Sequence, residues 1–214
     1  MRDKHLGYTK EACIENFEEA LLAQQHGAHQ IELCSQLHLD GCTPPKDDVI
    51  RCLEELDIHT KVMIRPVAGS FAVTEEVYDQ MKSEIIAMKN LGVQEVVFGL
   101  TRPDSRLDMN RIATLRDLAH PMDITIHKAI DTSVDIMEDL EKLMELGGIK
   151  SVLTSGGHNT ALAGQSVLRS MIEIAAAHID IIPAGKITFQ NIEDIHRSLN
   201  AKIYHGRQIV PLGS

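Results

Sequence analysis

Several features are missing from this 214-residue sequence, and each absence excludes a class of protein. It has no apolar run of about 18 residues, the minimum for a membrane-spanning helix. Its first residues, Met1 to Tyr8, lack the apolar core of a secretion signal. None of its four cysteines forms a Cys-x-x-Cys pair, so neither a structural zinc site nor a thioredoxin-like motif is indicated. Free thiols in a chain of this length predict a reducing, cytoplasmic location.

Basic charge is also scarce. The chain has 21 Lys and Arg against 31 Asp and Glu, a net charge of −10. Such a surface repels phosphate backbones and anionic headgroups, so we expect neither nucleic acid nor a membrane as partner. A local basic pocket could still bind a small anion. Because 43% of residues are apolar and no stretch resembles a linker, the whole range 1–214 is predicted to form one domain.

Short apolar or β-branched runs alternate along the chain with segments at helical spacing. This order predicts parallel strands joined by right-handed helical crossovers. The predicted strands lie near 9–14, 29–34, 59–65, 94–100, 122–128, 149–154, 178–183 and 202–205. The predicted helices cover 17–26, 46–56, 75–91, 108–119, 134–146, 160–177 and 189–199, and capping signals at Asn16, Thr74 and Asp131-Thr132-Ser133 support three of them.

Eight strands predict an α/β fold of the (β/α)₈ TIM-barrel type, near the lower size limit of that architecture. Only Gly206 to Ser214 follow the last strand, so the last βα unit is expected to be incomplete. A doubly wound open sheet is the alternative. The first strand is not followed by Gly-x-Gly-x-x-Gly, which counts against a dinucleotide-binding version of that sheet.

Side-chain alternation along the strands predicts a polar barrel interior. The first two strands each contain Glu-x-Cys, which puts Glu11 with Cys13 and Glu32 with Cys34 on one face. In the third strand Met63 and Arg65 are expected to face inward, and in the fifth Thr125 and His127. In the eighth strand His205 shares its face with Ile203, and the pattern leaves open which face is inward.

Buried carboxylates are costly unless they are paired, and Arg65 is the expected partner of Glu11 and Glu32. Catalytic groups of such barrels lie at the carboxyl ends of the strands, where we expect Glu32, Arg65 and His127 to converge. A polar network that only fixes strand register is the competing interpretation.

The loop after the sixth strand is a candidate anion site. Thr154-Ser155-Gly156-Gly157 precedes a helix, and glycine-rich turns at helix starts expose backbone amides. Phosphate sites in barrels usually involve the loops after strands seven and eight, so this loop is displaced by one strand. A plain turn with a cap explains the motif about as well.

From about Glu11 to Gly206, the sequence resembles the CutC family. The resemblance rests on Ile31-Glu-Leu-Cys-Ser35, Gly41 to Pro44, Met63-Ile-Arg-Pro66 with Gly69 and Phe71, Val97-Phe-Gly99, Ile126-His127 through Asp131, Leu153-Thr-Ser-Gly-Gly157 and His205-Gly206. It implies a (β/α)₈ barrel with an incomplete last unit, a cytoplasmic location, a homodimer and a link to copper tolerance. It also implies that Cys13 and Cys34 are candidate Cu(I) ligands.

The sequence departs from the family pattern at three places. His127-Lys128-Ala129-Ile130-Asp131 stands where the family has His-Arg-Ala-Phe-Asp, and Pro183-Ala184-Gly185-Lys186 where it has a glycine triplet. Val67 replaces the second arginine of Arg-Pro-Arg.

Two functional hypotheses follow. The first is Cu(I) binding by Cys13 and Cys34, because soft thiolates select Cu(I) and neighbouring strands are about 4.8 Å apart. The second is an enzyme acting on a small anionic metabolite, phosphorylated or carboxylated, without an organic cofactor. Its anion would bind Arg65 and the Ser155-Gly156-Gly157 amides. A proton would move through His127 or Glu32, with Asp131 orienting nearby groups and Glu11, Thr154 and His205 contacting the ligand.

Overall fold

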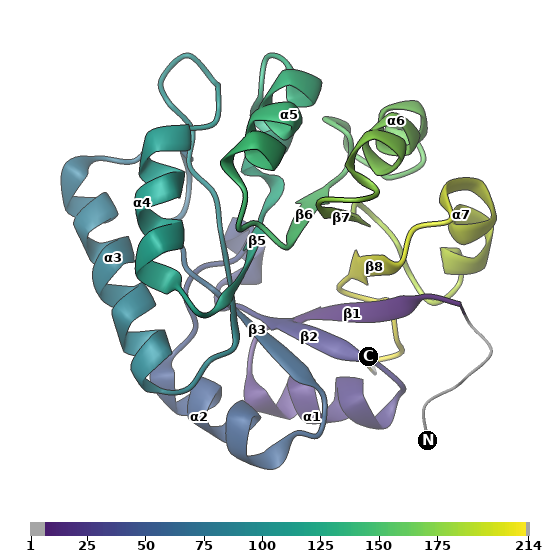
Figure 1. Cartoon of the computed structure of the whole chain (residues 1–214). Coiled ribbons are helices and arrows are strands. Elements are labelled where there is room, and N and C mark those ends of the chain that lie inside the picture. Colours follow the sequence, from purple (N-terminus) through teal and green to yellow (C-terminus); the bar gives the residue numbers. More distant parts are fainter. Residues whose placement is uncertain (1–6, 213–214) are drawn as a thin grey trace.

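The computed structural model describes residues 7–212, which form a ring of eight strands surrounded by helices (Figure 1). The strands are β1 Thr9–Ile14, β2 Gln30–Leu33, β3 His59–Met63, β4 Glu95–Phe98, β5 Asp123–Ile126, β6 Ser151–Thr154, β7 Asp180–Pro183 and β8 Ile203–Gly206. The helices are α1 Phe17–Gln25, α2 Lys46–Glu55, α3 Glu75–Asn90, α4 Met109–Ala119, α5 Ile136–Leu146, α6 Gln165–Ala175 and α7 Ile192–Leu199. Two short 3₁₀ turns are η1 Leu37–Leu39 and η2 Lys128–Thr132.

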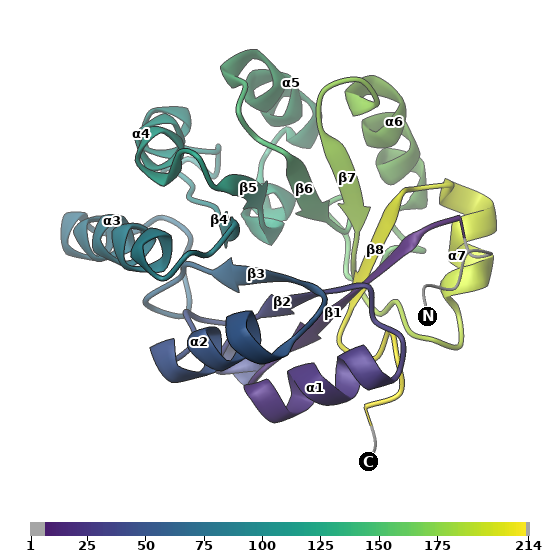
Figure 2. The ribbon, with the colours of Figure 1, turned by 60° about the horizontal axis from the view of Figure 1, so that its bottom comes forward.

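The strands are parallel and follow the order β7-β6-β5-β4-β3-β2-β1-β8, so the sheet curls until β1 meets β8 (Figure 2). Within residues 7–212 no ladder of hydrogen bonds joins β7 to β8. The segments that follow these two strands are joined instead, because the Phe189 amide donates a hydrogen bond to the Gln208 carbonyl at 2.8 Å. The predicted (β/α)₈ barrel is therefore confirmed, and the open doubly wound alternative is wrong.

Local sequence explains where most helices begin. The side chains of Asn16 and Thr74 accept hydrogen bonds from the Glu19 and Val77 amides, as N-caps do. The expectation for α5 was wrong in detail: its cap is Asp135, and Asp131 instead lies in η2 and binds another loop. The predicted helix 160–177 is also too long, because residues 160–164 are a turn before α6.

The main core lies between the barrel and its helices. The outward faces of the strands carry buried Ile31, Leu33, Val62 and Ile64, as side-chain alternation predicted. No eighth helix is present in residues 7–212; the segment after β8 instead buries Ile209 and Val210 in this core. None of the helices in the described range is long and apolar enough to span a membrane.

Candidate functional site at the carboxyl end of the barrel

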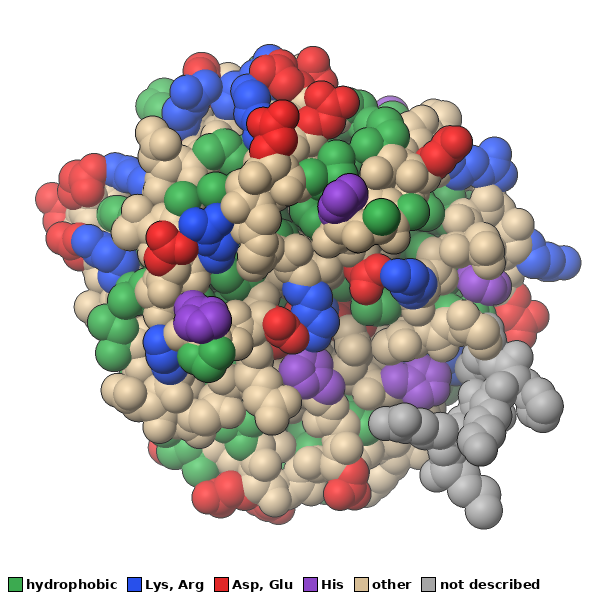
Figure 3. Space-filling view, in the orientation of Figure 1, with side chains coloured by type: hydrophobic (Ala, Val, Ile, Leu, Met, Phe, Trp, Pro, Cys, Tyr) green, Lys and Arg blue, Asp and Glu red, His purple; other side chains and the backbone are tan. Residues whose placement is uncertain are grey.

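A cavity of about 880 Å³ opens at the carboxyl ends of the strands. Residues that follow β2, β3, β5, β6, β7 and β8 line it, so it lies where barrel active sites are found. Its volume is within the range of small-molecule sites. On the face of the molecule seen in Figure 3, acidic and basic side chains are intermingled rather than gathered into a patch of one sign.

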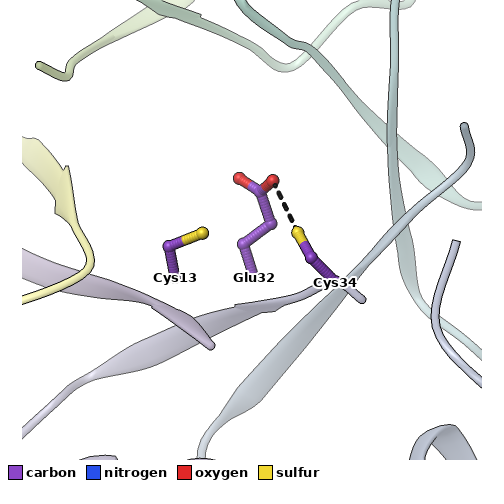
Figure 4. A group of neighbouring side chains, drawn as sticks. All are labelled: Cys13, Glu32 and Cys34. Atoms are coloured by element: carbon purple, nitrogen blue, oxygen red, sulfur yellow. Dashed lines mark hydrogen bonds between the residues drawn. The ribbon is translucent and has the colours of Figure 1, made fainter. Parts of the chain in front are cut away.

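Cys13, Glu32 and Cys34 form a cluster in the wall of this cavity (Figure 4). One ligand atom from each, two Sγ atoms and a carboxylate oxygen, lie within 4.8 Å of one another. The Cys34 thiol donates a hydrogen bond to Glu32 Oε1 at 3.4 Å. The register pairs Cys13 with Glu32, so the two Glu-x-Cys segments are offset by two residues and do not match position for position. Both thiols are nevertheless reduced and close together.

The thiols of this cluster differ in acidity. A hydrogen bond from Cys34 is the main reason that the pKa of Cys13 falls to about 5, and His205 contributes to the same effect. The pKa of Cys34 rises well above its ordinary value because this thiol keeps the shared proton and is buried. Burial also raises the pKa of Glu32 to about 7. Within this pair, the shifts favour the thiolate at Cys13 and the protonated thiol at Cys34.

His205 faces inward, which settles the question that strand alternation left open. Its Nδ1 lies 2.8 Å from Glu11 Oε1 and 3.5 Å from Glu32 Oε2, and these three residues form a second group with metal-ligating atoms within 4.8 Å. Burial lowers the pKa of His205, but Glu32 and Cys13 outweigh it and raise the pKa well above its usual value. Tyr204 faces outward, where its ring packs edge-on against Tyr8.

The expected ion pair between Arg65 and the buried carboxylates is wrong. Lys61, only 2% exposed, is the partner instead: its Nζ lies 2.9 Å from Glu11 Oε2 and 3.1 Å from Glu95 Oε1. Burial raises the pKa of Glu11, but Lys61 and His205 outweigh it and lower the pKa to about 2. Lys61 lies two residues before Met63, so it is on the same face of β3 as Met63 and Arg65. Extending the side-chain alternation back to residue 61 would have predicted that Lys61 faces inward.

Arg65 holds loops rather than carboxylates. Its Nη1 donates to the carbonyls of Leu39 at 3.1 Å and Gly41 at 2.8 Å, and its Nη2 donates to Gly69 at 2.9 Å. The guanidinium carbon also lies 5.0 Å from the centre of the Phe71 ring. Arg65 thus fixes the loops after β2 and β3 and remains part of the cavity wall.

His127 packs against the same phenyl ring. Its ring centroid is 5.0 Å from that of Phe71, and its Nδ1 accepts the Ala129 amide at 3.1 Å. Burial, and then the Arg65 charge, lower the pKa of His127 to about 3. Glu32, Arg65 and His127 all line the cavity, as expected, but no hydrogen bond or ion pair joins them among the described residues.

The loop after β6 has a different role from the one expected. The carboxylate of Asp131 accepts the amides of Ser155 at 3.0 Å and Gly157 at 2.9 Å, together with the hydroxyls of Thr154 and Ser155. The Gly156 amide donates to Thr154 Oγ1. A side chain of the protein therefore already occupies the amides that were expected to bind an external anion.

Comparison with known proteins agrees with this architecture. The sequence model of the CutC family matches residues 8–210. The chain belongs to the CutC family. A human relative, named copper homeostasis protein cutC homolog, is 34% identical over 199 residues, which cover 93% of this chain and 72% of the relative. A CutC family protein of Mesorhizobium japonicum is 33% identical over 195 residues, covering 91% and 75% of the two chains.

Solved structures show the same fold. A crystal structure described as CutC from Streptococcus agalactiae superposes with a TM-score of 0.89 at 24% identity, over 95% of this chain and all of the other. Phosphoribosylanthranilate isomerase from Thermotoga maritima gives a TM-score of 0.60 at 12% identity, over 92% and 86% of the two chains. At these identities the likeness shows the shared barrel alone.

Two of the three segments that were expected to depart from the family pattern contribute residues to the cavity of this CutC chain. Lys128 lines the cavity, and its Nζ is 3.8 Å from Asp131 Oδ2. Ile130 is fully buried in the main core, and Val67 is 51% exposed. Ala184 and Gly185 of the altered segment line the cavity as well. Lys128 and the segment 184–186 thus change the cavity wall, Ile130 and Val67 do not line it, and the thiol cluster is intact.

Proposed function

We propose that this protein acts in copper homeostasis and binds Cu(I) through the thiolates of Cys13 and Cys34. One observation supports this most: the two sulfur atoms lie within 4.8 Å of each other beside a cavity that opens to the surface. The names of the human and mouse relatives point to the same process.

The donor set suits a soft monovalent ion. Thiolates are the ligands that Cu(I) prefers, whereas the Glu32 carboxylate is a hard oxygen donor that Cu(I) does not favour. The lowered pKa of Cys13 favours its thiolate, whereas the raised pKa of Cys34 means that this thiol must lose a proton to become a second ligand. Glu32 accepts the Cys34 S–H hydrogen bond and is the group placed to take that proton.

The experiment is a Cu(I) titration of the reduced protein against a competing chelator. We expect one tightly bound Cu(I) per chain in the wild type and its loss in the Cys13→Ser/Cys34→Ser variant. Cys42→Ser/Cys52→Ser removes the same number of thiols from positions outside the cavity and should bind Cu(I) as the wild type does. Equal affinity of all three proteins would exclude Cys13 and Cys34 as ligands.

We further propose that the protein works as a single-domain homodimer in the reducing cytoplasm. The free thiols support the compartment, since soft thiolate sites persist where disulfides do not form. The family resemblance supports the dimer. Light scattering of the purified chain would test its mass.

A further inference from the structure

The cavity wall contains buried polar atoms that nothing in the described protein satisfies. Arg65 Nε and His127 Nε2 have no hydrogen-bond partner, although the two residues are only 7% and 4% exposed. Buried N–H groups without a partner destabilise a fold, so native proteins rarely leave two together. Glu32 Oε2 also lacks a hydrogen bond, but His205 Nδ1 lies 3.5 Å from it, and Glu32 belongs to the thiol cluster described above.

The ring of His127 is a neutral hydrogen-bond donor. Its Nδ1 accepts the Ala129 amide, so Nδ1 carries no proton and the proton of the neutral ring is on Nε2. Burial and the neighbouring Arg65 keep the pKa far below its usual range, so the ring does not take a second proton at neutral pH. The unpartnered Nε2 is therefore an N–H for which the described chain supplies no acceptor.

Arg65 carries a buried positive charge without a counter-ion. All three of its observed side-chain hydrogen bonds go to neutral backbone carbonyls. Among the described residues, no carboxylate lies within ion-pair distance of its guanidinium, whereas Lys61 has two. A buried charge normally requires a charged partner, and here the cavity is the side from which one can arrive.

Both donor residues pack against the ring of Phe71. The guanidinium carbon of Arg65 and the ring of His127 each lie 5.0 Å from the centre of the Phe71 ring, and all three residues line the cavity. We propose that the cavity binds a small organic carboxylate, whose oxygens accept hydrogen bonds from Arg65 Nε–H and His127 Nε2–H. This site is separate from the cysteine pair and does not depend on copper.

Gly99 acts as a positioning residue for this site. A Cβ atom at that position would lie 2.8 Å from His127 Nδ1 and 2.9 Å from its Cε1, closer than such atoms approach. Any side chain at position 99 would thus push the imidazole away from the Ala129 amide that fixes its tautomer. Within the motif Val97-Phe-Gly99, Val97 packs beside Cys34 and Met63, and the close approach of His127 explains the glycine.

The test uses the full, metal-free chain labelled with ¹⁵N and titrated with glycolate or pyruvate. The side-chain signals of His127 Nε2–H and Arg65 Nε–H should shift together and saturate. His127→Phe keeps an aromatic ring beside Phe71 but removes the donor, and it should weaken carboxylate binding by about tenfold or more. His178→Phe is the matched control, because His178 is exposed and lies outside the cavity, so the substitution should leave binding unchanged.

Three results would overturn the proposal. One is the absence of any saturable shift at either donor with both carboxylates. Another is equal carboxylate affinity in wild type and His127→Phe. The third is binding of inorganic phosphate that both carboxylates fail to displace, which would assign the site to phosphate. If His127→Phe does not fold, the titration of the wild type decides by itself, because the two N–H signals report contact directly.

Discussion

Buried ionised side chains are the least usual residues in this barrel, since barrel interiors are normally layered with branched apolar side chains. Lys61 joins Glu11 to Glu95, and Glu95 also lies 2.9 Å from His59 Nε2 and 2.8 Å from Lys150 Nζ. Burial opposes ionisation of each group, but the opposite charges outweigh it, so the pKa of Glu95 is lowered and that of Lys61 is raised. Each charge is therefore stable only while its partners are present.

The low pKa of His127 predicts how the stability of the protein depends on pH. Its pKa is about 3 in the folded chain and about 6.5 when unfolded, so between these values the unfolded chain binds more protons. This contribution to stability is complete above pH 6.5 and is lost as the pH falls toward 3. His127→Phe lacks this contribution. As the pH falls from 6.5 toward 3, the unfolding free energy of the wild type should therefore fall relative to that of the variant by about 1.4 kcal/mol per pH unit.

Urea unfolding at a series of pH values measures that gap. His158→Phe, at an exposed position, serves as the control and should follow the wild type throughout. A constant difference between wild type and His127→Phe from pH 7 to pH 4 would contradict the neutral state assigned to the buried ring.

At the scale of elements, η2 and the loop after β6 form one unit held by a carboxylate. Gly156 and Gly157 have φ values of 69° and 73°, a left-handed conformation that side chains disfavour, and this turn directs two backbone amides toward Asp131. The loop resembles an anion-binding nest whose anion is supplied by the chain itself. The cavity wall on this side is therefore preformed.

Asp131→Asn should loosen that wall. The amide keeps one oxygen acceptor but replaces the other with a donor, so we expect a loss of about 2 kcal/mol in unfolding free energy. Hydrogen exchange at the Ser155 and Gly157 amides should become faster. The control is Asp135→Asn, because that side chain caps α5 through a single amide and asparagine caps equally well. Equal losses of unfolding free energy in the two variants would contradict a stabilising role of the Asp131 network beyond that of a single helix cap.

At the scale of the whole molecule, the barrel is completed without a full set of helices. Between α7 and α1, where an eighth helix would lie, the chain after β8 packs Ile209 and Val210 into the core and leaves Arg207 and Gln208 exposed (Figure 2). The same segment forms a β-bridge with the loop after β7 through Thr188 and Gln208. This bridge lies beside β7 and β8, which are not themselves joined by a ladder of hydrogen bonds in the described range. At this position a short segment shields the apolar outer face of the barrel, as a helix does at the other positions.

Ile209→Ala should therefore destabilise the entire barrel. Removing a fully buried isoleucine side chain costs about 2–5 kcal/mol, and here the cavity would form in the main core beneath the segment after β8. Leu212→Ala, three residues further along and half-buried, should cost much less. Denaturant unfolding of both variants tests this; similar midpoints would mean that the segment after β8 is not part of the cooperative core.

The sequence by itself determined the order of elements and the inward faces of the strands. Side-chain alternation is a local property, so it correctly placed Cys13, Cys34, Glu32 and His127 in the barrel interior. The motifs also identified the family. Asn16 and Thr74 were found as caps because capping involves residues only three apart.

Only the tertiary structure decided which polar groups meet. Lys61 rather than Arg65 neutralises Glu11, and Asp131 rather than an external anion occupies the amides of the loop after β6. The partners in these pairs lie between 23 residues (Asp131 and Thr154) and 50 residues (Glu11 and Lys61) apart in the sequence. The register between β1 and β2 also offsets Cys13 and Cys34 by two residues. Strand register and loop geometry, which depend on the closed barrel as a whole, set these pairings, and a single strand's pattern carries no information about them.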